Sequence, residues 1–305
     1  MWNCKDLRLR VMTKNHKMKP ALFWFKKENS AEVQCLLCPH GCVIAEGQIG
    51  RCRVRKNIDG ELYSLNYGLV TATALDPIEK KPLHRFFPGK RVFSLGTFGC
   101  NLACSYCQNW QIAHQEQRKI SATYLAPEEA VAKAKELMPL GNIGIAYTYS
   151  EPLMWFEYVL DTAKLAREAG LKNILVTNGY INPQPLKKLL PFIDAVNLDV
   201  KAFTNEFYHE LCQGSLEPVL RSAKPFAQNC HVEITTLLIS GQNDNLEEIA
   251  ALAQWIAKID RSIPLHLTRY FPNYKLQLPP TPSESLQKAK KVAEKFLDDV
   301  LLGNI

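Results

Sequence analysis

The feature that most restricts the fold is a regular alternation of short apolar runs and helical periods from Arg91 onward. This alternation is typical of repeated βα units around a parallel sheet. At 305 residues the chain can bury a sizeable core. We expect six parallel strands, at 92–96, 143–147, 174–177, 195–200, 232–239 and 265–269. We expect the main helices at 127–138, 154–168, 217–228, 246–258 and 283–297.

Three cysteines follow the first expected strand, Cys100, Cys104 and Cys107, in the spacing Cys-x3-Cys-x2-Cys. Thiols so close on one tight loop can face a common point as soft ligands of an iron–sulfur cluster or of zinc. Three ligands leave one iron of a four-iron cluster open to a substrate, whereas a structural site is normally closed by a fourth. The alternatives are a zinc knuckle or three buried thiols.

With Tyr106 directly before its last cysteine, this pattern resembles the signature of the radical SAM superfamily. The resemblance implies a 4Fe-4S cluster held by the three cysteines and S-adenosylmethionine (SAM) bound at the open iron. It also implies reductive cleavage of SAM to a 5'-deoxyadenosyl radical. The implied fold is α/β, a partial parallel (β/α)6 radical SAM barrel preceded by a small cysteine-bearing N-terminal module.

The resemblance covers nearly everything after about Pro20. The run Asp-Pro-Ile-Glu-Lys-Lys-Pro-Leu at 76–83 and the run Cys-Gln-Asn-Trp at 107–110 are similar to the AmmeMemoRadiSam-system branch of the superfamily. Its wider neighbours are the activating enzymes of glycyl-radical enzymes, such as the pyruvate formate-lyase activating enzyme. We therefore expect an activase-like radical SAM enzyme.

Polar residues stand at the carboxyl ends of the expected strands, where parallel αβ barrels gather their functional groups. Glu151 follows the second strand and Asn178 the third. Asp199 and Lys201 share one face at the end of the fourth, because side chains alternate along a strand. The resemblance implies that Asp199 contacts the ribose or the ammonium group of SAM and Lys201 its carboxylate. The alternative is an internal ion pair.

Further residues are assigned to the cofactor by the same resemblance. Glu151 stands where the superfamily often has a Gly-Gly-Glu element that meets the methionine amino group, although only the glutamate matches here. Its alternative role is to cap the next helix. The expected cofactor-binding residues are Tyr106, Asn109, Glu151, Asn178, Asp199 and Lys201.

The sixth strand offers a substrate-side candidate. His266 shares a face with Thr268 and Tyr270, and we assign it to catalysis, with a structural role as the alternative. Cys212 and Cys230 lack metal-ligand spacing and are expected to be ordinary buried thiols.

A second set of cysteines precedes the barrel. Cys35, Cys38, Cys42 and Cys52 form a Cys-x2-Cys-x3-Cys-x9-Cys series, enough for a closed four-thiolate site, with His40 as an alternative ligand. The series is compatible with zinc, with a second iron–sulfur cluster, or with reduced thiols or a redox disulfide. Neighbouring arginines would favour the thiolate form.

The charge is concentrated at the amino terminus. Residues 1–27 carry eight Lys and Arg against one acid, which accounts for the whole net charge of +7. A basic tail on a neutral body is weak evidence for nucleic-acid binding. We expect three segments: a disordered tail at 1–20, the cysteine-bearing module and connector at 21–90, and the radical SAM core at 91–305. The tail could also be a targeting segment or reflect an upstream start, with Met18 as the second candidate.

The expected partners follow from these assignments. They are SAM, an electron donor such as flavodoxin or ferredoxin, and a protein acceptor, with RNA or a small molecule as alternative acceptors. A metal-stabilised binding module is the non-enzymatic alternative. Because the sequence contains no membrane-span run or secretory signal, we expect a cytoplasmic protein whose ten cysteines are metal ligands or free thiols.

Overall fold

The computed structural model describes residues 18–115 and 119–305, and its centre is an eight-stranded sheet. The sheet is ordered β16-β15-β14-β13-β12-β11-β9-β8. Its strands are β8 (Ala72–Pro77), β9 (Arg91–Gly96), β11 (Asn142–Tyr147), β12 (Lys172–Thr177), β13 (Ala195–Asp199), β14 (His231–Leu238), β15 (Leu265–Arg269) and β16 (Val300–Gly303).

The six predicted strands are confirmed as β9 and β11 to β15, all parallel to one another. Two further strands extend the sheet at its edges. β16 pairs in parallel with β15, and β8 pairs antiparallel with β9. The run that forms β16 was not predicted, because four residues ending in a glycine carry too short a pattern. Residues 69–75, which overlap β8, have the short apolar run of a strand, but sequence periodicity does not tell which sheet a strand joins.

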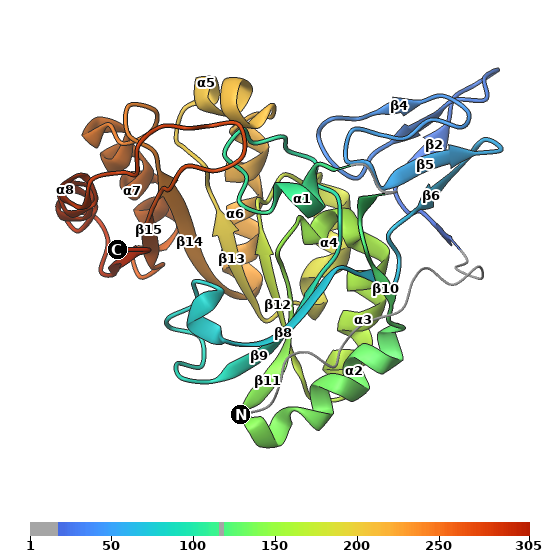
Figure 1. The fold of residues 1–305 in the computed structure, drawn as a ribbon, viewed down its shortest axis with the longest axis horizontal. Coiled ribbons are helices and arrows are strands. Elements are labelled where there is room, and N and C mark those ends of the chain that lie inside the picture. The colour runs from blue at the N-terminus through green and yellow to red at the C-terminus, as the bar shows by residue number, and fades with distance from the viewer. Residues whose placement is uncertain (1–17, 116–118) are drawn as a thin grey trace.

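Helices connect the parallel strands, and Figure 1 shows α2 and α3 beside one end of the sheet and α7 and α8 beside the other. The helices are α1 (Trp110–Ala113), α2 (Pro127–Glu136), α3 (Phe156–Glu168), α4 (Pro183–Leu189), α5 (Asn205–Phe207), α6 (Glu217–Asn229), α7 (Leu246–Asp260) and α8 (Ser283–Ala293). The five predicted helices correspond to α2, α3, α6, α7 and α8. The two prolines of α4 hid it from periodicity.

Local chemistry explains where these helices begin and end. Asn245 caps α7, and its side-chain oxygen accepts a hydrogen bond from the Glu247 amide at 2.7 Å. Gly170 ends α3 at a φ of +75°, a conformation that suits glycine. Pro127 opens α2, where its missing amide hydrogen has no helical partner to lose.

Short strands form the module before the main sheet, drawn in blue in Figure 1. They are β1 (Lys19–Pro20), β2 (Trp24–Lys26), β3 (Val33–Cys35), β4 (Val43–Ile44), β5 (Arg55–Ile58) and β6 (Glu61–Ser64). They make two three-stranded sheets, β2-β3-β4 and β1-β6-β5. The Arg55 guanidinium joins the module to α3 through the Glu157 carboxylate at 2.7 Å, and both side chains are buried.

The predicted tail at 1–20 is only partly described, because residues 1–17 lie outside the described residues. Its last part differs from the prediction. Lys19 and Pro20 form β1, which pairs with β6. The Lys19 ammonium also contacts the Asp161 carboxylate at 2.9 Å, so pairing and charge hold this segment on the body.

The segment 78–90 connects β8 to β9, and we call it the strap. Between these two strands of the sequence it runs across to β13 and β14. Asn197 of β13 donates a hydrogen bond to the Pro82 carbonyl at 2.9 Å. The amides of His84 and Arg85 donate to the Glu233 carboxylate of β14 at 3.0 and 2.7 Å. The strap therefore lies against the inner residues of the middle strands.

None of the helices in the described residues has the length and apolar character to cross a bilayer.

Candidate functional site

A cavity of about 420 Å³ opens at the carboxyl ends of the parallel strands. This is within the roughly 300–1,000 Å³ of small-molecule sites. Nine of the ten residues predicted for the barrel site line it. They are Cys100, Cys104, Tyr106, Cys107, Asn109, Glu151, Asn178, Asp199 and Lys201.

The cysteine loop leaves β9 through Gly99, which has a φ of +93°. A Cβ here would lie 2.5 Å from Val54 Cγ1 and 2.8 Å from the Cys52 carbonyl, so glycine lets the loop pack against the N-terminal module. Backbone hydrogen bonds hold the other side of the loop. The Ala103 amide donates to the Cys212 carbonyl and the Ser105 amide to the Leu211 carbonyl, both at 2.8 Å.

The three loop thiols have different environments. Burial raises the pKa of Cys100 well above its ordinary value and that of Cys107 to about 11. A hydrogen bond with the Cys212 thiol instead lowers the pKa of Cys104, against the effect of burial. Among the described residues, no three His, Cys, Asp or Glu side chains form a group that could hold a single metal ion as they stand. A cubane presents a separate iron to each cysteine, so its ligands need not converge on one atom.

Cys212 is buried, as predicted, but its contacts differ from those of an ordinary core thiol. It ends a π-helical turn, Tyr208–Cys212. Its sulfur lies 3.3 Å from the Tyr106 hydroxyl and is hydrogen-bonded to Cys104. Cys212 is far from the loop in sequence and has no ligand spacing, so motif analysis could not find this contact. Cys230 is only half-buried, in contrast to the prediction, and its thiol donates to the Phe226 carbonyl of α6, the helix that ends at the preceding residue.

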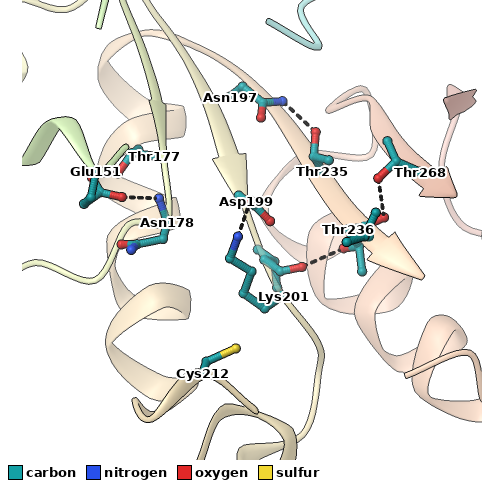
Figure 2. Close-up of polar contacts among 12 residues, drawn as sticks. Glu151, Thr177, Asn178, Asn197, Asp199, Lys201, Cys212, Thr235, Thr236 and Thr268 are labelled. Atoms are coloured by element: carbon teal, nitrogen blue, oxygen red, sulfur yellow. Dashed lines mark hydrogen bonds and ion pairs between the residues drawn. The ribbon is translucent and has the colours of Figure 1, made fainter. Parts of the chain in front are cut away.

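Glu151 is buried and accepts three hydrogen bonds. The donors are the Thr177 hydroxyl at 2.6 Å, the Asn178 amide at 2.9 Å and the Leu153 amide at 3.0 Å. Burial raises the pKa of Glu151 to about 7, although these hydrogen bonds oppose it. Figure 2 shows the carboxylate turned toward the Asn178 backbone. Glu151 thus caps the next turn and also ties the ends of two strands together.

Asp199 and Lys201 lie together at the end of β13, as predicted from strand alternation. Figure 2 shows the Lys201 ammonium directed at the Asp199 carboxylate, with which it forms an ion pair. Burial alone would lower the pKa of Lys201, but Asp199 and the cysteine thiols hold it well above its ordinary value. The second oxygen of Asp199, Oδ1, is buried and has no hydrogen-bond partner among the described residues. An unsatisfied carboxylate oxygen at a cavity wall is suited to a ligand donor.

Two asparagines connect the loop to the cavity wall. Asn178 donates to Asn101 Oδ1 at 3.0 Å and to Cys100 Sγ at 3.8 Å. Asn109 donates to the Tyr149 carbonyl at 2.6 Å. Both therefore position the cysteine loop.

His266 does not line this cavity, in contrast to its predicted place there. It is buried, and its Nε2 lies 2.6 Å from the Glu233 carboxylate, where the strap is also held. The predicted face was right for Thr268, which lines the cavity. The predicted depth of His266 was wrong, because His266 lies two positions before Thr268 on β15, a separation of about 6.6 Å along the strand.

A group of residues that were not predicted as site residues forms another part of the wall. Lys80 and Lys81 line the cavity, and their ammonium groups contact the Asp76 carboxylate at 2.9 and 2.7 Å. The Tyr149 hydroxyl donates to the same carboxylate at 2.8 Å, and its ring lies 4.6 Å from the Lys81 nitrogen. The only sequence signal was the run at 76–83, which spacing rules do not interpret.

The four N-terminal cysteines also lie together. They line a separate cavity of about 10 Å³, close to the space of one water molecule, with His40 and Arg55 in its wall. Burial raises the pKa of Cys38 to about 12 and that of Cys52 to about 11. His40 Nε2 lies 2.7 Å from the Asn101 carbonyl, which links this cavity to the cysteine loop.

Comparisons with known proteins find a family model and several relatives that match this chain. The model of the radical SAM superfamily matches residues 94–256, more than half of the chain. A protein of Methanocaldococcus jannaschii, named only as uncharacterized, is 41% identical over 94% of this chain and 86% of its own length. The pyruvate formate-lyase 1-activating enzyme of Escherichia coli K12 is 23% identical over 65% of this chain and 86% of its own.

A solved structure has the same fold. SuiB of Streptococcus suis, in its structure with SAM, aligns with a TM-score of 0.56 at 15% identity, over 75% of this chain and 54% of its own. The three-cysteine loop and the strands β11 to β14 lie within the residues that the family model matches. This chain belongs to the radical SAM superfamily.

Proposed function

We propose that Cys100, Cys104 and Cys107 hold a 4Fe-4S cluster and that the 420 Å³ cavity binds SAM beside it. The observation that carries this proposal is the opening of all three thiols onto one cavity at the carboxyl ends of the strands. When bound, the reduced cluster and SAM supply a 5'-deoxyadenosyl radical that can remove hydrogen from an unactivated carbon.

The residues present fit these groups. Ser150 Oγ and Asp199 Oδ1 belong to cavity-lining residues, are buried, and have no partner among the described residues. His114 Nε2 is also buried and without a hydrogen-bond partner among the described residues, and His114 lines the same cavity. SAM carries an ammonium group, ribose hydroxyls and ring nitrogens, which supply both donors and acceptors. Partners of this kind would satisfy buried polar atoms that are otherwise costly.

The charged pair on β13 provides the strongest polar contacts for SAM. Asp199 can accept from the ribose hydroxyls or the ammonium group through its free oxygen. Lys201 can donate to the carboxylate while it keeps its contact with Asp199. Charge-assisted hydrogen bonds of this kind fix orientation as well as affinity.

The proposed reaction is the removal of hydrogen from an acceptor. The similarity to an enzyme named as a pyruvate formate-lyase 1-activating enzyme supports a protein acceptor and an activase-like role. A low-potential electron carrier of the flavodoxin or ferredoxin class would supply the electron. The barrel wall would keep water and oxygen from the reacting atoms.

For the N-terminal cysteines we propose a closed metal site, either zinc or a second iron–sulfur cluster. A single zinc ion would require these thiols to turn toward one point, because as they stand no three of the described side chains could hold one ion. The support is the shared cavity of four thiols and the cation of Arg55 in its wall, which offsets thiolate charge. Zinc would be structural only, because it does not change redox state, whereas a second cluster could relay electrons.

The central test is anaerobic reconstitution of the full chain with iron and sulfide. After reduction with dithionite in the presence of SAM, we expect 5'-deoxyadenosine by chromatography and a SAM-dependent change in the EPR signal. A matched control is Cys230→Ala, which removes a thiol outside the cavity and should form the same product. A fully loaded cluster that leaves SAM intact would contradict the proposed function.

A further inference from the structure

The strap brings a buried lysine into a cavity where the proposed cofactor contacts give it no task. The Lys81 side chain is 3% exposed, yet it lines the cavity together with Lys80, which is 64% exposed. Burying an ammonium group costs free energy unless the charge is paired or used. Here Asp76 supplies the pairing, with contacts of 2.7 Å to Lys81 and 2.9 Å to Lys80.

The charges in this group do not balance. Burial alone would raise the pKa of Asp76, but hydrogen bonds from Lys81, Lys80 and Tyr149 hold it well below its ordinary value. One carboxylate thus faces two ammonium groups, so this group of three side chains carries one net positive charge. An excess cation in a partly enclosed site attracts anions.

Tyr149 is held in a strained conformation to build this group. Its φ is +72°, which non-glycine residues rarely adopt and which is often found at functional sites. Its ring lies against Gly96, where a Cβ would come within 2.6 Å of Tyr149 Cδ2. The strain places the hydroxyl on Asp76 and the ring 4.6 Å from the Lys81 ammonium.

The strap meets β13 further toward the amino end of that strand than Asp199 and Lys201, the residues assigned to SAM. Pro82, which follows Lys81 in the strap, accepts a hydrogen bond from Asn197, which precedes Asp199 by two positions on β13. Two positions correspond to about 6.6 Å along a strand. The strap therefore forms a floor, and the two lysines belong to its β8 side.

SAM itself does not account for this excess charge. Its sulfonium and ammonium groups outweigh its single carboxylate, and Lys201 is already placed to meet that carboxylate. A second excess cation would oppose SAM rather than hold it. An anionic group on the acceptor would instead be attracted by this excess cation and by the positive groups of SAM.

We propose that Lys80 and Lys81 form an anion subsite that receives a carboxylate or phosphate group of the acceptor. This inference rests on the proposed function, because it takes the acceptor to share the cavity with SAM. Lysine suits either group, since its ammonium acts as a point charge and does not require planar, two-point recognition.

The test uses the reconstituted full chain with SAM bound and measures anion binding directly. Equilibrium dialysis with radiolabelled inorganic phosphate, and separately with labelled acetate, is carried out at constant ionic strength in chloride. We expect saturable binding of at least one of the two anions, with about one site per chain. The stronger of the two indicates which group the acceptor carries.

The decisive variant is the double change Lys80→Gln and Lys81→Gln, which should weaken anion binding about tenfold or more. Lys187→Gln with Lys188→Gln is the matched control, because it removes an adjacent lysine pair on α4 whose members are exposed. If the double change destabilises the chain, Lys80→Gln alone answers the question, since Lys80 is largely exposed. The single change should weaken binding several-fold.

Three outcomes would overturn the inference. The first is the absence of saturable binding of either anion to the wild-type chain. The second is an equal loss in the cavity variant and in the α4 control, which would indicate diffuse surface charge. The third is a parallel loss of SAM affinity, which would assign the lysines to SAM. Deoxyadenosine formation is measured separately, so its absence would contradict the proposed function and leave the anion result intact.

Discussion

The two groups of cysteines have the same side-chain chemistry and very different surroundings. Cys35, Cys38, Cys42 and Cys52 enclose about 10 Å³, whereas the three cysteines of the loop after β9 face about 420 Å³. The small cavity lies within a module of short strands that is joined to α3 by a buried ion pair. The large cavity lies where seven parallel strands end.

The difference separates two uses of a thiol. Four ligands in a closed space saturate a metal and contribute its binding free energy to folding. Three ligands beside an open space leave a coordination position for a reactant. We therefore expect changes in the first group to affect stability and metal content, and changes in the second to affect reaction.

The largest expected effect tests this division directly. Changing Cys100, Cys104 and Cys107 to Ala should reduce SAM cleavage below detection while the chain stays folded, because no open iron would remain. Deoxyadenosine formation and circular dichroism measure the two properties. Substantial cleavage in the triple variant would remove the distinction between the two groups.

The same variant also sharpens the comparison, since only the N-terminal cysteines would remain as candidate ligands. Metal analysis and anaerobic EPR should then report the N-terminal site alone. Retained iron with a reducible signal would support a second cluster, and stoichiometric zinc a structural site. A chain free of both metals would contradict the proposed metal site.

The second prediction concerns the ion pair beside the small cavity. Glu157→Gln leaves the Arg55 guanidinium buried without its countercharge, which should cost about 3–5 kcal/mol of unfolding free energy. Urea unfolding measures the effect. Glu136→Gln is the control, because its pair with Lys133 is exposed and should contribute about 0–1 kcal/mol. Equal effects would show that the small cavity is not anchored through this pair.

The third prediction concerns Glu151 at the large cavity. Burial raises its pKa from an ordinary value near 4.5 to about 7, so the folded chain binds more protons than the unfolded chain between these values. Stability should therefore fall as pH rises from about 4.5 to 7, by on the order of 3 kcal/mol. Urea unfolding of the cluster-free chain measures it. Glu151→Gln should remove this dependence, and an unchanged pH profile would contradict the assignment.

The fourth prediction separates binding from cluster assembly at the large cavity. Asp199→Asn and Lys201→Met should each weaken SAM binding by about 1.5–3 kcal/mol, the value of a hydrogen bond to a charged group. Iron content should stay at the wild-type level, because neither residue is a proposed ligand. SAM affinity by calorimetry and iron by colorimetry test both statements. Unchanged affinity in both variants would leave only an internal ion pair.

The smallest expected effect concerns Cys212, whose thiol contacts Cys104 and Tyr106. A hydrogen bond to a cluster sulfur stabilises the reduced state, so Cys212→Ala should make the reduction potential more negative. The expected shift corresponds to about 0.5–1.5 kcal/mol. An EPR-monitored redox titration measures it, with Cys230→Ala as the control. A reduction potential equal to that of the control would mean that Cys212 contributes only packing.

The sequence predicted those parts of the site that depend on strand order and alternation. Asp199 and Lys201 could be placed because a parallel sheet brings all carboxyl ends to one edge. The same reasoning failed for His266, since alternation predicts a face and not a depth. Cys212 and Lys81 were not recognised, because both reach the site through connections whose paths no periodicity describes.

The strap has a consequence for how enzymes of this kind could acquire new acceptors. The floor of the large cavity is made by residues that precede the first parallel strand, whereas the proposed SAM contacts follow it. Exchange of the segment 72–90 between relatives by recombination would therefore replace the acceptor end of the cavity and leave the cofactor end intact. A relative that receives this segment should therefore acquire the acceptor preference of the donor. A family with one cofactor chemistry could in this way evolve new acceptors without altering its barrel.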